Sequence, residues 1–206
     1  MYSTRPGLIL GFHGCDQSVV DKVFGGKEEM EWSKHEYDWL GHGIYFWEHS
    51  YERALDFARE EKRRKRKERP IDKPAVIGAV INLGYCLDLL DFSNLRILKE
   101  GYNILKESSE SQDFSLPENT NANNNGDLLI RKLDCLSIET LHETKIKNNA
   151  IPFDSVRGVF FEGNELYKGA GFREKNHIQI CIRNPNCIKG YFLPRALTKD
   201  GFWAKT

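Results

Sequence analysis

Short apolar runs, separated by glycine, proline and charged clusters, set the pattern of this 206-residue chain. Continuously apolar runs predict buried strands, and runs whose apolar residues recur every three or four positions predict helices. We expect strands at 8–12, 44–46, 75–83, 86–90, 155–161, 177–183 and 187–192. We expect helices at 18–24, 50–69, 93–105 and 128–141. Because regular strand–helix–strand units are missing, the pattern favours an α+β fold with a mostly antiparallel or mixed sheet.

One polar stretch, residues 107–127, interrupts this pattern. It is rich in Ser, Asn, Glu and Asp and has few apolar residues to bury. Such a segment cannot offset the entropy lost on ordering, so we expect a mobile loop there. The chain as a whole is long enough for one domain with a sizeable core, and a single domain over 1–206 is the expectation.

The composition excludes several classes of protein. Thirty Lys and Arg residues balance thirty Asp and Glu residues, so no net charge draws the chain to nucleic acid or to a membrane. No apolar run approaches the roughly 18–20 residues of a membrane helix, and the N-terminus lacks the features of a signal peptide. The five cysteines are odd in number and form no Cys-x-x-Cys pair, which disfavours a disulfide framework or a structural zinc site. A reducing cytoplasm is therefore the expected location.

A basic run at 62–69 has two interpretations. It can be the solvated C-terminal end of a helix, where cations interact favourably with the helix dipole. It can also be a phosphate-binding patch, since clustered Lys and Arg release counterions from nucleic acid. The first interpretation is favoured, because the rest of the chain is not basic.

Three short motifs carry the candidate chemistry. His13-Gly14 follows the first expected strand, and Tyr45 follows the turn of the tract Gly41-His42-Gly43-Ile44-Tyr45-Phe46. Gln179 lies in the late strand that precedes an Asn-Pro turn. In this order the motifs resemble the His-Tyr-Glu triad of the ADP-ribosyltransferase superfamily, in its poly(ADP-ribose) polymerase and diphtheria-toxin branch.

This resemblance implies an ADP-ribosyltransferase-like split mixed β-sheet with flanking helices, with NAD as the substrate and no metal. His13 would bond the ribose 2′-hydroxyl, and the backbone of Gly14 would pair with the nicotinamide amide. Tyr45 would stack under the nicotinamide ring, with Gly43 shaping the turn before it. Phe57 would close the other face, where the family usually carries a second Tyr; its alternative role is plain helix core.

The third motif departs from the family because position 179 is Gln rather than Glu. An amide can accept a hydrogen bond from a ribose hydroxyl, but it brings no charge and cannot act as a base. Polymer synthesis, which relies on the carboxylate, is therefore disfavoured, and transfer of one ADP-ribose unit or hydrolysis of NAD is favoured. His177, two residues earlier on the same strand face, would serve as the base for the acceptor.

We therefore expect a NAD-dependent mono-ADP-ribosyltransferase that modifies a macromolecule, either a nucleic acid or a protein. By resemblance, the loop 163–175 would recognise this acceptor through Glu165, Arg173 or Glu174. Small free-standing transferases of this kind resemble toxins of toxin–antitoxin or phage-defence systems, which implies a neutralising antitoxin partner. The alternatives are a NAD glycohydrolase, a non-catalytic module that binds NAD or ADP-ribose, and a nucleic-acid-binding protein that uses the run 62–69.

Two other local patterns are disfavoured. Cys15 lies beside His13, but residues this close point apart in a strand or turn, and the sequence places no orienting Asn or Asp for a cysteine hydrolase. His35, His42 and His49 are spaced by seven, but the glycines between them exclude the helix that would align them. A metal site formed by these histidines is therefore not expected.

Overall fold

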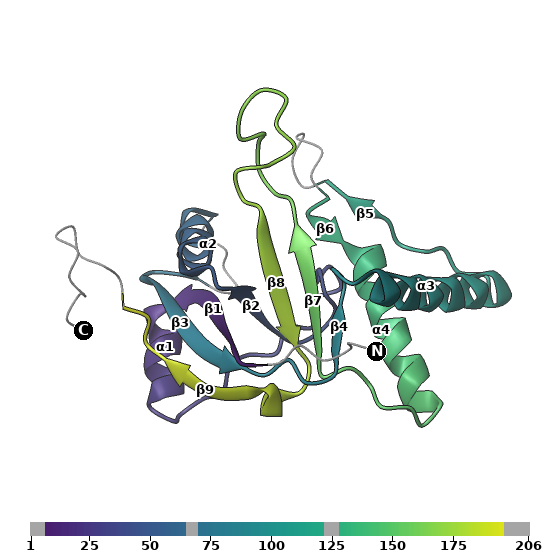
Figure 1. The fold of residues 1–206 in the computed structure, drawn as a ribbon, viewed down its shortest axis with the longest axis horizontal. Helices are drawn as coiled ribbons and strands as arrows, with labels where there is room; N and C mark the ends of the chain where they lie inside the picture. The colour runs from purple at the N-terminus through teal and green to yellow at the C-terminus, as the bar shows by residue number, and fades with distance from the viewer. Residues whose placement is uncertain (1–6, 65–69, 122–127, 196–206) are drawn as a thin grey trace. The chain divides into compact units, whose positions relative to one another are not determined.

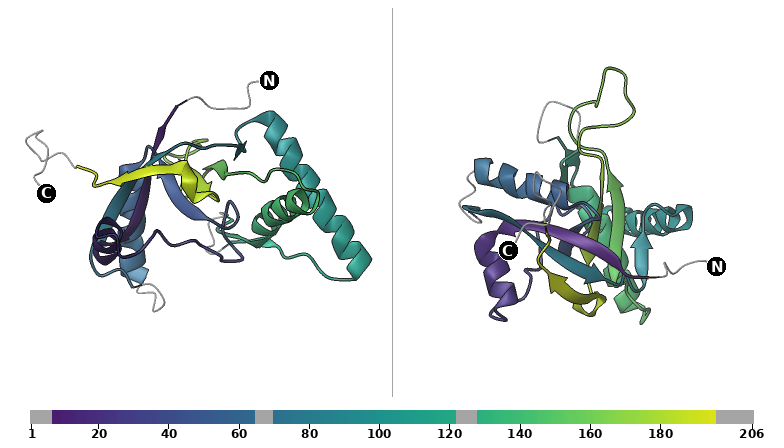
Figure 2. Two further views of the ribbon diagram at one scale, coloured as in Figure 1. Left: turned by 90° about the horizontal axis from the view of Figure 1, so that it is seen from below. Right: turned by 60° about the vertical axis from the view of Figure 1, so that its left-hand side comes forward.

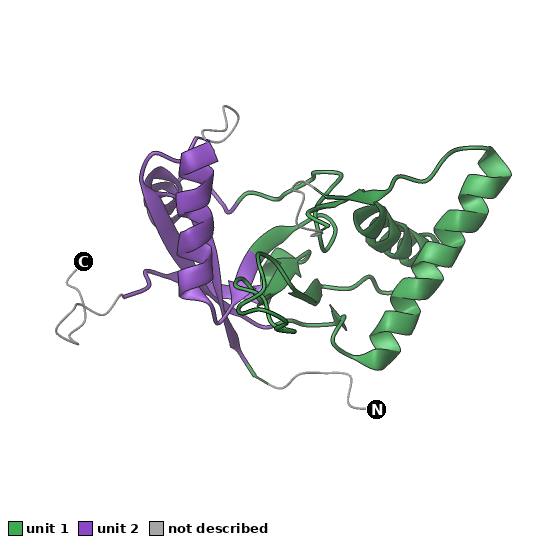
Figure 3. Cartoon of the chain, turned by 90° about the horizontal axis from the view of Figure 1, so that it is seen from above, with its two compact units in different colours: residues 1–7, 31–45, 83–187 green, residues 8–30, 46–82, 188–206 purple. Residues whose placement is uncertain are grey.

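The computed structural model describes residues 7–64, 70–121 and 128–195, which form a mixed α/β structure with a mostly antiparallel, multi-stranded sheet and flanking helices (Figure 1). The chain divides into two compact units (Figure 3). The first unit contains residues 31–45 and 83–187, and the second contains residues 8–30, 46–82 and the chain from 188 onward. Among the described residues, no helix combines the length and apolar character needed to cross a bilayer.

The first unit is built on three adjacent strands and two helices. The strands are β4 (Cys86–Asp88), β7 (Ser155–Phe160) and β8 (His177–Ile182), and the helices are α3 (Phe92–Gln112) and α4 (Lys132–Lys147). β4 and β7 run parallel, whereas β7 and β8 are antiparallel. The two-residue strands β5 (Asn119–Thr120) and β6 (Ile130–Arg131) form a separate small ladder, and a 3-10 turn, η1 (Pro185–Cys187), ends the unit.

The core of the first unit explains why its strands read as apolar runs. β7 is buried at five of its six positions, so both of its faces are covered. Leu87, Val156 and Ile138 are fully or almost fully buried in one cluster that joins β4, β7 and α4. The helices α3 and α4 lie side by side (Figure 2). They approach closely at Gly101, where an added Cβ would lie 2.9 Å from the Leu141 Cβ.

The second unit has four strands, adjacent in the order β2-β1-β3-β9, and two helices. They are β1 (Ile9–Asp16), β2 (Ile44–Glu48, which enters this unit at residue 46), β3 (Pro74–Ile81), β9 (Ile188–Phe192), α1 (Gln17–Phe24) and α2 (Tyr51–Arg64). β1 pairs antiparallel with β3 from Ile9↔Ile81 to Asp16↔Pro74. Asp16 ends the strand and caps α1, since its carboxylate accepts from the Ser18 N–H at 3.0 Å.

Helix α2 packs against β1 at a glycine. A Cβ added to Gly14 would overlap the Ala54 carbonyl oxygen, so only glycine allows the backbones to come this close. Ala54 and Ala58 are fully buried on the same helix face, and Trp47 and Val76 complete the adjoining apolar cluster.

Most of the expected elements are confirmed, with differences in length. The helix expected at 128–141 runs from Lys132 to Lys147, and Ile130–Arg131 form β6 instead. The first strand extends beyond Phe12 to Asp16, because its whole length pairs with β3. The expected loop 107–127 is wrong over 107–112, where α3 continues and buries Ser109. Within the same stretch, Asn119 and Thr120 pair with β6, and residues 122–127 lie outside the described residues. The expected helix 50–69 is described as far as Arg64.

The contact at Gly14 generates the first prediction. Gly14→Ala should lower the free energy of unfolding by about 1–3 kcal/mol, because the new methyl group forces α2 away from β1. Urea denaturation followed by circular dichroism measures this change. Gly190→Ala in β9 is the control, since its Cβ would meet no atom within 4 Å. An equal effect of the two substitutions would contradict the proposed helix contact.

Candidate functional site

Tyr45 is the second residue of β2 and is held by its hydroxyl. The Leu40 N–H donates to this oxygen at 2.9 Å, and the hydroxyl donates to the Gly41 carbonyl at 2.6 Å. Burial, helped by the nearby Cys181 and Asp38, raises the pKa of Tyr45 well above its usual value, so the hydroxyl stays protonated and can donate. The residue as a whole is partly buried, and it packs against the apolar core cluster of the first unit.

The turn before Tyr45 requires both of its glycines. Gly41 has φ of +75°, in the left-handed region that residues with a Cβ rarely adopt. A Cβ on Gly43 would lie 2.5 Å from the Cys181 Sγ and 2.6 Å from the Ile182 carbonyl oxygen. The turn therefore packs directly against β8, and the glycines that the sequence singled out have this structural role.

Two of the predicted residues, His177 and Gln179, lie on the face of β8 that contacts the Tyr45 turn. Alternation along a strand places His177, Gln179 and Cys181 on one face. The Cys181 Sγ lies 3.5 Å from the Gly41 carbonyl oxygen, in the turn that also binds the Tyr45 hydroxyl. Gln179 is half-buried and pairs across the ladder with a glycine. The first unit thus brings the Tyr45 turn, Gln179 and His177 to one face of the same strand.

His177 is buried and has a defined tautomer. Its Nδ1 lies 2.6 Å from the Lys175 carbonyl oxygen, and a carbonyl can only accept. In the neutral ring Nδ1 therefore carries the proton, and Nε2, which is buried, carries the lone pair. The imidazole is flanked by the rings of Trp39 and Phe160, with centroids at 6.2 and 5.7 Å.

His13 and Gly14 lie on β1 of the second unit. The His13 ring meets Phe46 edge-on, with centroids 6.1 Å apart. The Leu10 carbonyl accepts from the His49 N–H on the β2 side, so alternation directs the N–H and C=O of Gly14 to that same edge. Gly14 lies beyond the two β1–β2 pairs, at Gly11 and Phe12. Its backbone N–H and C=O are therefore directed toward the β2 edge of β1.

Phe57 also belongs to the second unit, where it packs as helix core. Its ring lies 4.9 Å from that of Trp47, in the cluster that includes Ala54 and Val76. Part of its surface is exposed, so a stacking role against a ligand stays a prediction.

The cysteine and histidine patterns that the sequence disfavoured have ordinary structural explanations. Burial, together with the charge of Asp16, raises the pKa of Cys15 to about 12, which removes the thiolate that a nucleophile requires. His35 stacks on Tyr37 at 5.0 Å. Over the residues that the structure describes, no group of three or more His, Cys, Asp or Glu side chains is placed to hold a metal ion.

The hairpin between β7 and β8 is shaped by the polar residues predicted to meet the acceptor, and it extends past both strands (Figure 1). The backbones of Glu165 and Arg173 form an isolated antiparallel β-bridge, and the Glu165 carboxylate accepts from the Gly169 N–H. The Glu174 carboxylate accepts from the backbone N–H and the side-chain amide of Asn164. Three large apolar side chains of this hairpin are also exposed, namely Leu166, Tyr167 and Phe172, at 59–63%. No pattern in the sequence marked them as contact residues.

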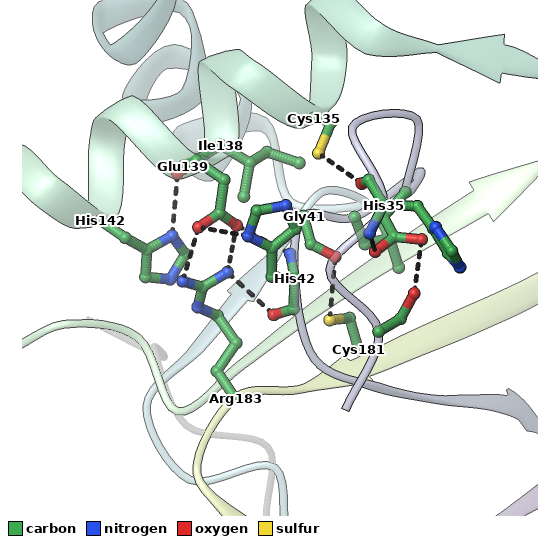
Figure 4. A network of polar contacts seen from close by, with 12 residues as sticks. His35, Gly41, His42, Cys135, Ile138, Glu139, His142, Cys181 and Arg183 are labelled. Atoms are coloured by element: carbon green, nitrogen blue, oxygen red, sulfur yellow. Dashed lines mark hydrogen bonds and ion pairs between the residues drawn. The ribbon is translucent and has the colours of Figure 1, made fainter. Parts of the chain in front are cut away.

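A partly buried ion pair that no sequence pattern marked contacts His42, in the turn that precedes Tyr45 (Figure 4). Glu139 of α4 and Arg183, which follows β8, pair with each other and both bind the backbone of His42. No short-range sequence signal joins these residues, since Glu139 and Arg183 are separated by 44 positions.

Two surface cavities of the second unit do not involve the predicted residues. One, of about 230 Å³, is lined by Asp16, Asp72 and neighbours, and the other, of about 390 Å³, by Val20, Leu55 and neighbours. Neither contains His13, so cavity volume does not locate the site.

The closed turn gives the second prediction. Tyr45→Phe keeps the ring but removes the partner of the Leu40 N–H and the Gly41 carbonyl, so it should lower the free energy of unfolding by about 1–3 kcal/mol. Chemical denaturation measures this, with Tyr167→Phe as the control because Tyr167 is 63% exposed. If the two substitutions had the same small effect, the hydroxyl would not be holding the turn.

Comparison with known proteins gives one relative. An uncharacterized protein of the archaeon Methanocaldococcus jannaschii is 25% identical over 194 residues, which cover 86% of this chain and 83% of that protein. No profile of a known protein family and no solved structure matches the chain. The likeness extends over most of both chains, and the name of the archaeal protein assigns no activity to it.

Proposed function

We propose that the chain is a mono-ADP-ribosyltransferase that uses NAD to modify a macromolecule. The observation that carries the proposal is the grouping of the Tyr45 turn, Gln179 and His177 on one face of β8. An aromatic surface beside an uncharged hydrogen-bonding side chain and an oriented imidazole suits a neutral pyridine carboxamide and its ribose. The proposal includes an ADP-ribosyltransferase-like sheet, for which the mostly antiparallel strands and flanking helices give coarse support.

The residues of the first unit fit the steps of this reaction. The bond between the ribose C1′ and the nicotinamide nitrogen breaks, and its electron pair leaves with neutral nicotinamide, so no general acid is required. The acceptor nucleophile forms the new bond to C1′ and gives its proton to the His177 Nε2, while the Lys175 carbonyl holds Nδ1–H. Gln179 accepts a hydrogen bond from a ribose hydroxyl and orients the sugar.

The residues of the second unit supply the remaining roles. His13 bonds the ribose 2′-hydroxyl, and the Gly14 N–H and C=O pair with the carboxamide of nicotinamide. Gln179 gives less stabilisation to the positive charge on the ribose than a carboxylate would, which favours a single transfer over polymer synthesis. The biological role we propose is that of a cytoplasmic toxin or phage-defence effector, neutralised by an antitoxin protein.

Transfer of label tests this proposal. The protein is incubated with NAD labelled in the adenylate phosphate and with a cell lysate, and released nicotinamide is measured in parallel. His13→Ala and His177→Asn should each lower transfer by about 10²-fold or more, because each removes a group that acts on the reacting atoms. His49→Asn is the control, since His49 is exposed and has a positive φ of 50° that Asn tolerates.

Gln179→Glu gives a prediction of the opposite sign. A carboxylate at this position adds a negative charge near the oxocarbenium-like ribose, so release of nicotinamide should rise by about tenfold or more. Gln179→Ala should lower the release of nicotinamide.

Digestion of the labelled product with protease and with nuclease then identifies the acceptor. Free ADP-ribose without labelled macromolecule would instead indicate a glycohydrolase, and binding of NAD without release of nicotinamide would rule out both enzymes.

A further inference from the structure

We propose that Glu139 and Arg183 are positioning residues, which fix the turn that carries Tyr45 in the shape that receives nicotinamide. The nicotinamide part of this inference rests on the proposed function. The order that the ion pair imposes on the turn can be tested without any ligand.

The ion pair binds the turn through its backbone. The His42 N–H donates to Glu139 Oε1 at 2.8 Å, and Arg183 Nη1 donates to the His42 carbonyl at 3.0 Å. Arg183 and Glu139 face each other fork to fork, with Nη2 and Oε2 at 3.0 Å and Nη1 bonded to Oε1 (Figure 4). Both backbone polar groups of His42, its N–H and its C=O, are thus bound by side chains, one from α4 and one from the residue that follows β8.

A short chain of contacts joins this pair to Tyr45. Gly41 packs against the carboxylate, since an added Cβ would lie 2.5 Å from Glu139 Oε1. The Gly41 carbonyl then accepts from the Tyr45 hydroxyl, and the Leu40 N–H donates to the same hydroxyl. The ion pair therefore fixes His42, and His42 and Gly41 in turn fix the tyrosine. A displaced turn would tilt the ring that we propose stacks on nicotinamide.

The charges and hydrogen bonds around Glu139 keep its carboxylate in the ionised state. Burial alone would raise the pKa of Glu139, but the hydrogen bonds and charge of Arg183, together with the His42 N–H, hold it below its usual value. The carboxylate is therefore ionised at neutral pH and keeps both acceptor oxygens. The His42 Nδ1 lies 3.4 Å from Glu139 Oε2, so a protonated His42 would strengthen the same contact.

The competing explanation is that the ion pair only stabilises the fold. The first unit offers a matched control in the pair Asp88–Arg157, with Nη1–Oδ distances of 3.0 and 3.2 Å. Its side chains are 13% and 3% exposed, against 16% and 15% for Glu139 and Arg183. The control pair joins β4 to β7 and has no contact with His42 among those described. Asp88→Asn therefore reproduces the loss of a buried carboxylate without disturbing the Tyr45 turn.

Amide hydrogen exchange of the Leu40 N–H in the full chain is the direct test. Glu139→Gln should speed its exchange by about tenfold or more, whereas Asp88→Asn should change it by less than about twofold. Arg183→Lys, which keeps the charge and one donor, should give an intermediate value. This third variant keeps the test decisive if Glu139→Gln does not fold. Unchanged exchange of Leu40 in the folded Glu139 or Arg183 variants would overturn the proposal.

Ligand titration by calorimetry adds a readout that a purely structural role would not change. Glu139→Gln should weaken binding of NAD and of nicotinamide by about tenfold or more, with binding of ADP-ribose unchanged, because only the nicotinamide stack depends on the Tyr45 turn. Asp88→Asn should leave all three affinities unchanged. Equal loss in both variants, or equal loss for all three ligands, would contradict positioning. If the wild-type protein binds none of the ligands, the proposed function fails, and the exchange of Leu40 alone decides whether the pair orders the turn.

Discussion

The partly buried pair of Glu139 and Arg183 is the interaction on which the structure of the Tyr45 turn depends. It differs from an exposed surface ion pair, because its side chains are only 16% and 15% exposed and each binds a backbone group of His42, the N–H and the C=O respectively. A buried carboxylate without its guanidinium would be costly, so the two residues and the turn form one cooperative element. The positive φ of Gly41 and the tight contact of Gly43 with β8 are strained or crowded positions that this element sustains.

The chemistry that this element supports follows from what surrounds Tyr45. The hydroxyl is used inside the turn, so the residue can offer its ring but not a proton. The adjoining face of β8 carries an amide at Gln179 and an imidazole at His177, whose Nδ1 lies 2.6 Å from the Lys175 carbonyl oxygen. These groups can orient a sugar and accept one proton, but they bring no fixed negative charge. A single glycosyl transfer from a substrate with a good neutral leaving group fits this set better than a reaction that requires strong charge stabilisation.

Sequence patterns predicted the elements of the fold well where the physics is local. Apolar runs such as 75–83 and 177–183 became strands, and Gly41-His42-Gly43 became a tight turn, because burial and glycine conformations are determined by neighbouring residues. The loop expected at 107–127 was wrong in part, since contact with the rest of the first unit extends α3 beyond its weak local pattern. The role of Glu139 could not be predicted from the sequence either, because its partner Arg183 is 44 positions away. Polar residues of the β7–β8 hairpin were predicted to meet the acceptor, whereas its exposed surface also carries three large apolar side chains.

The proposed function requires that Tyr45, Gln179 and His13 each contact the nicotinamide end of NAD. Nuclear magnetic resonance of the isotope-labelled chain tests it most directly, by following the side-chain signals of these three residues while NAD is added. The account predicts that the signals shift together and saturate with one affinity, and that nicotinamide alone shifts Tyr45. Saturable binding of NAD that leaves all three signals unchanged, or no binding at millimolar NAD, would contradict it.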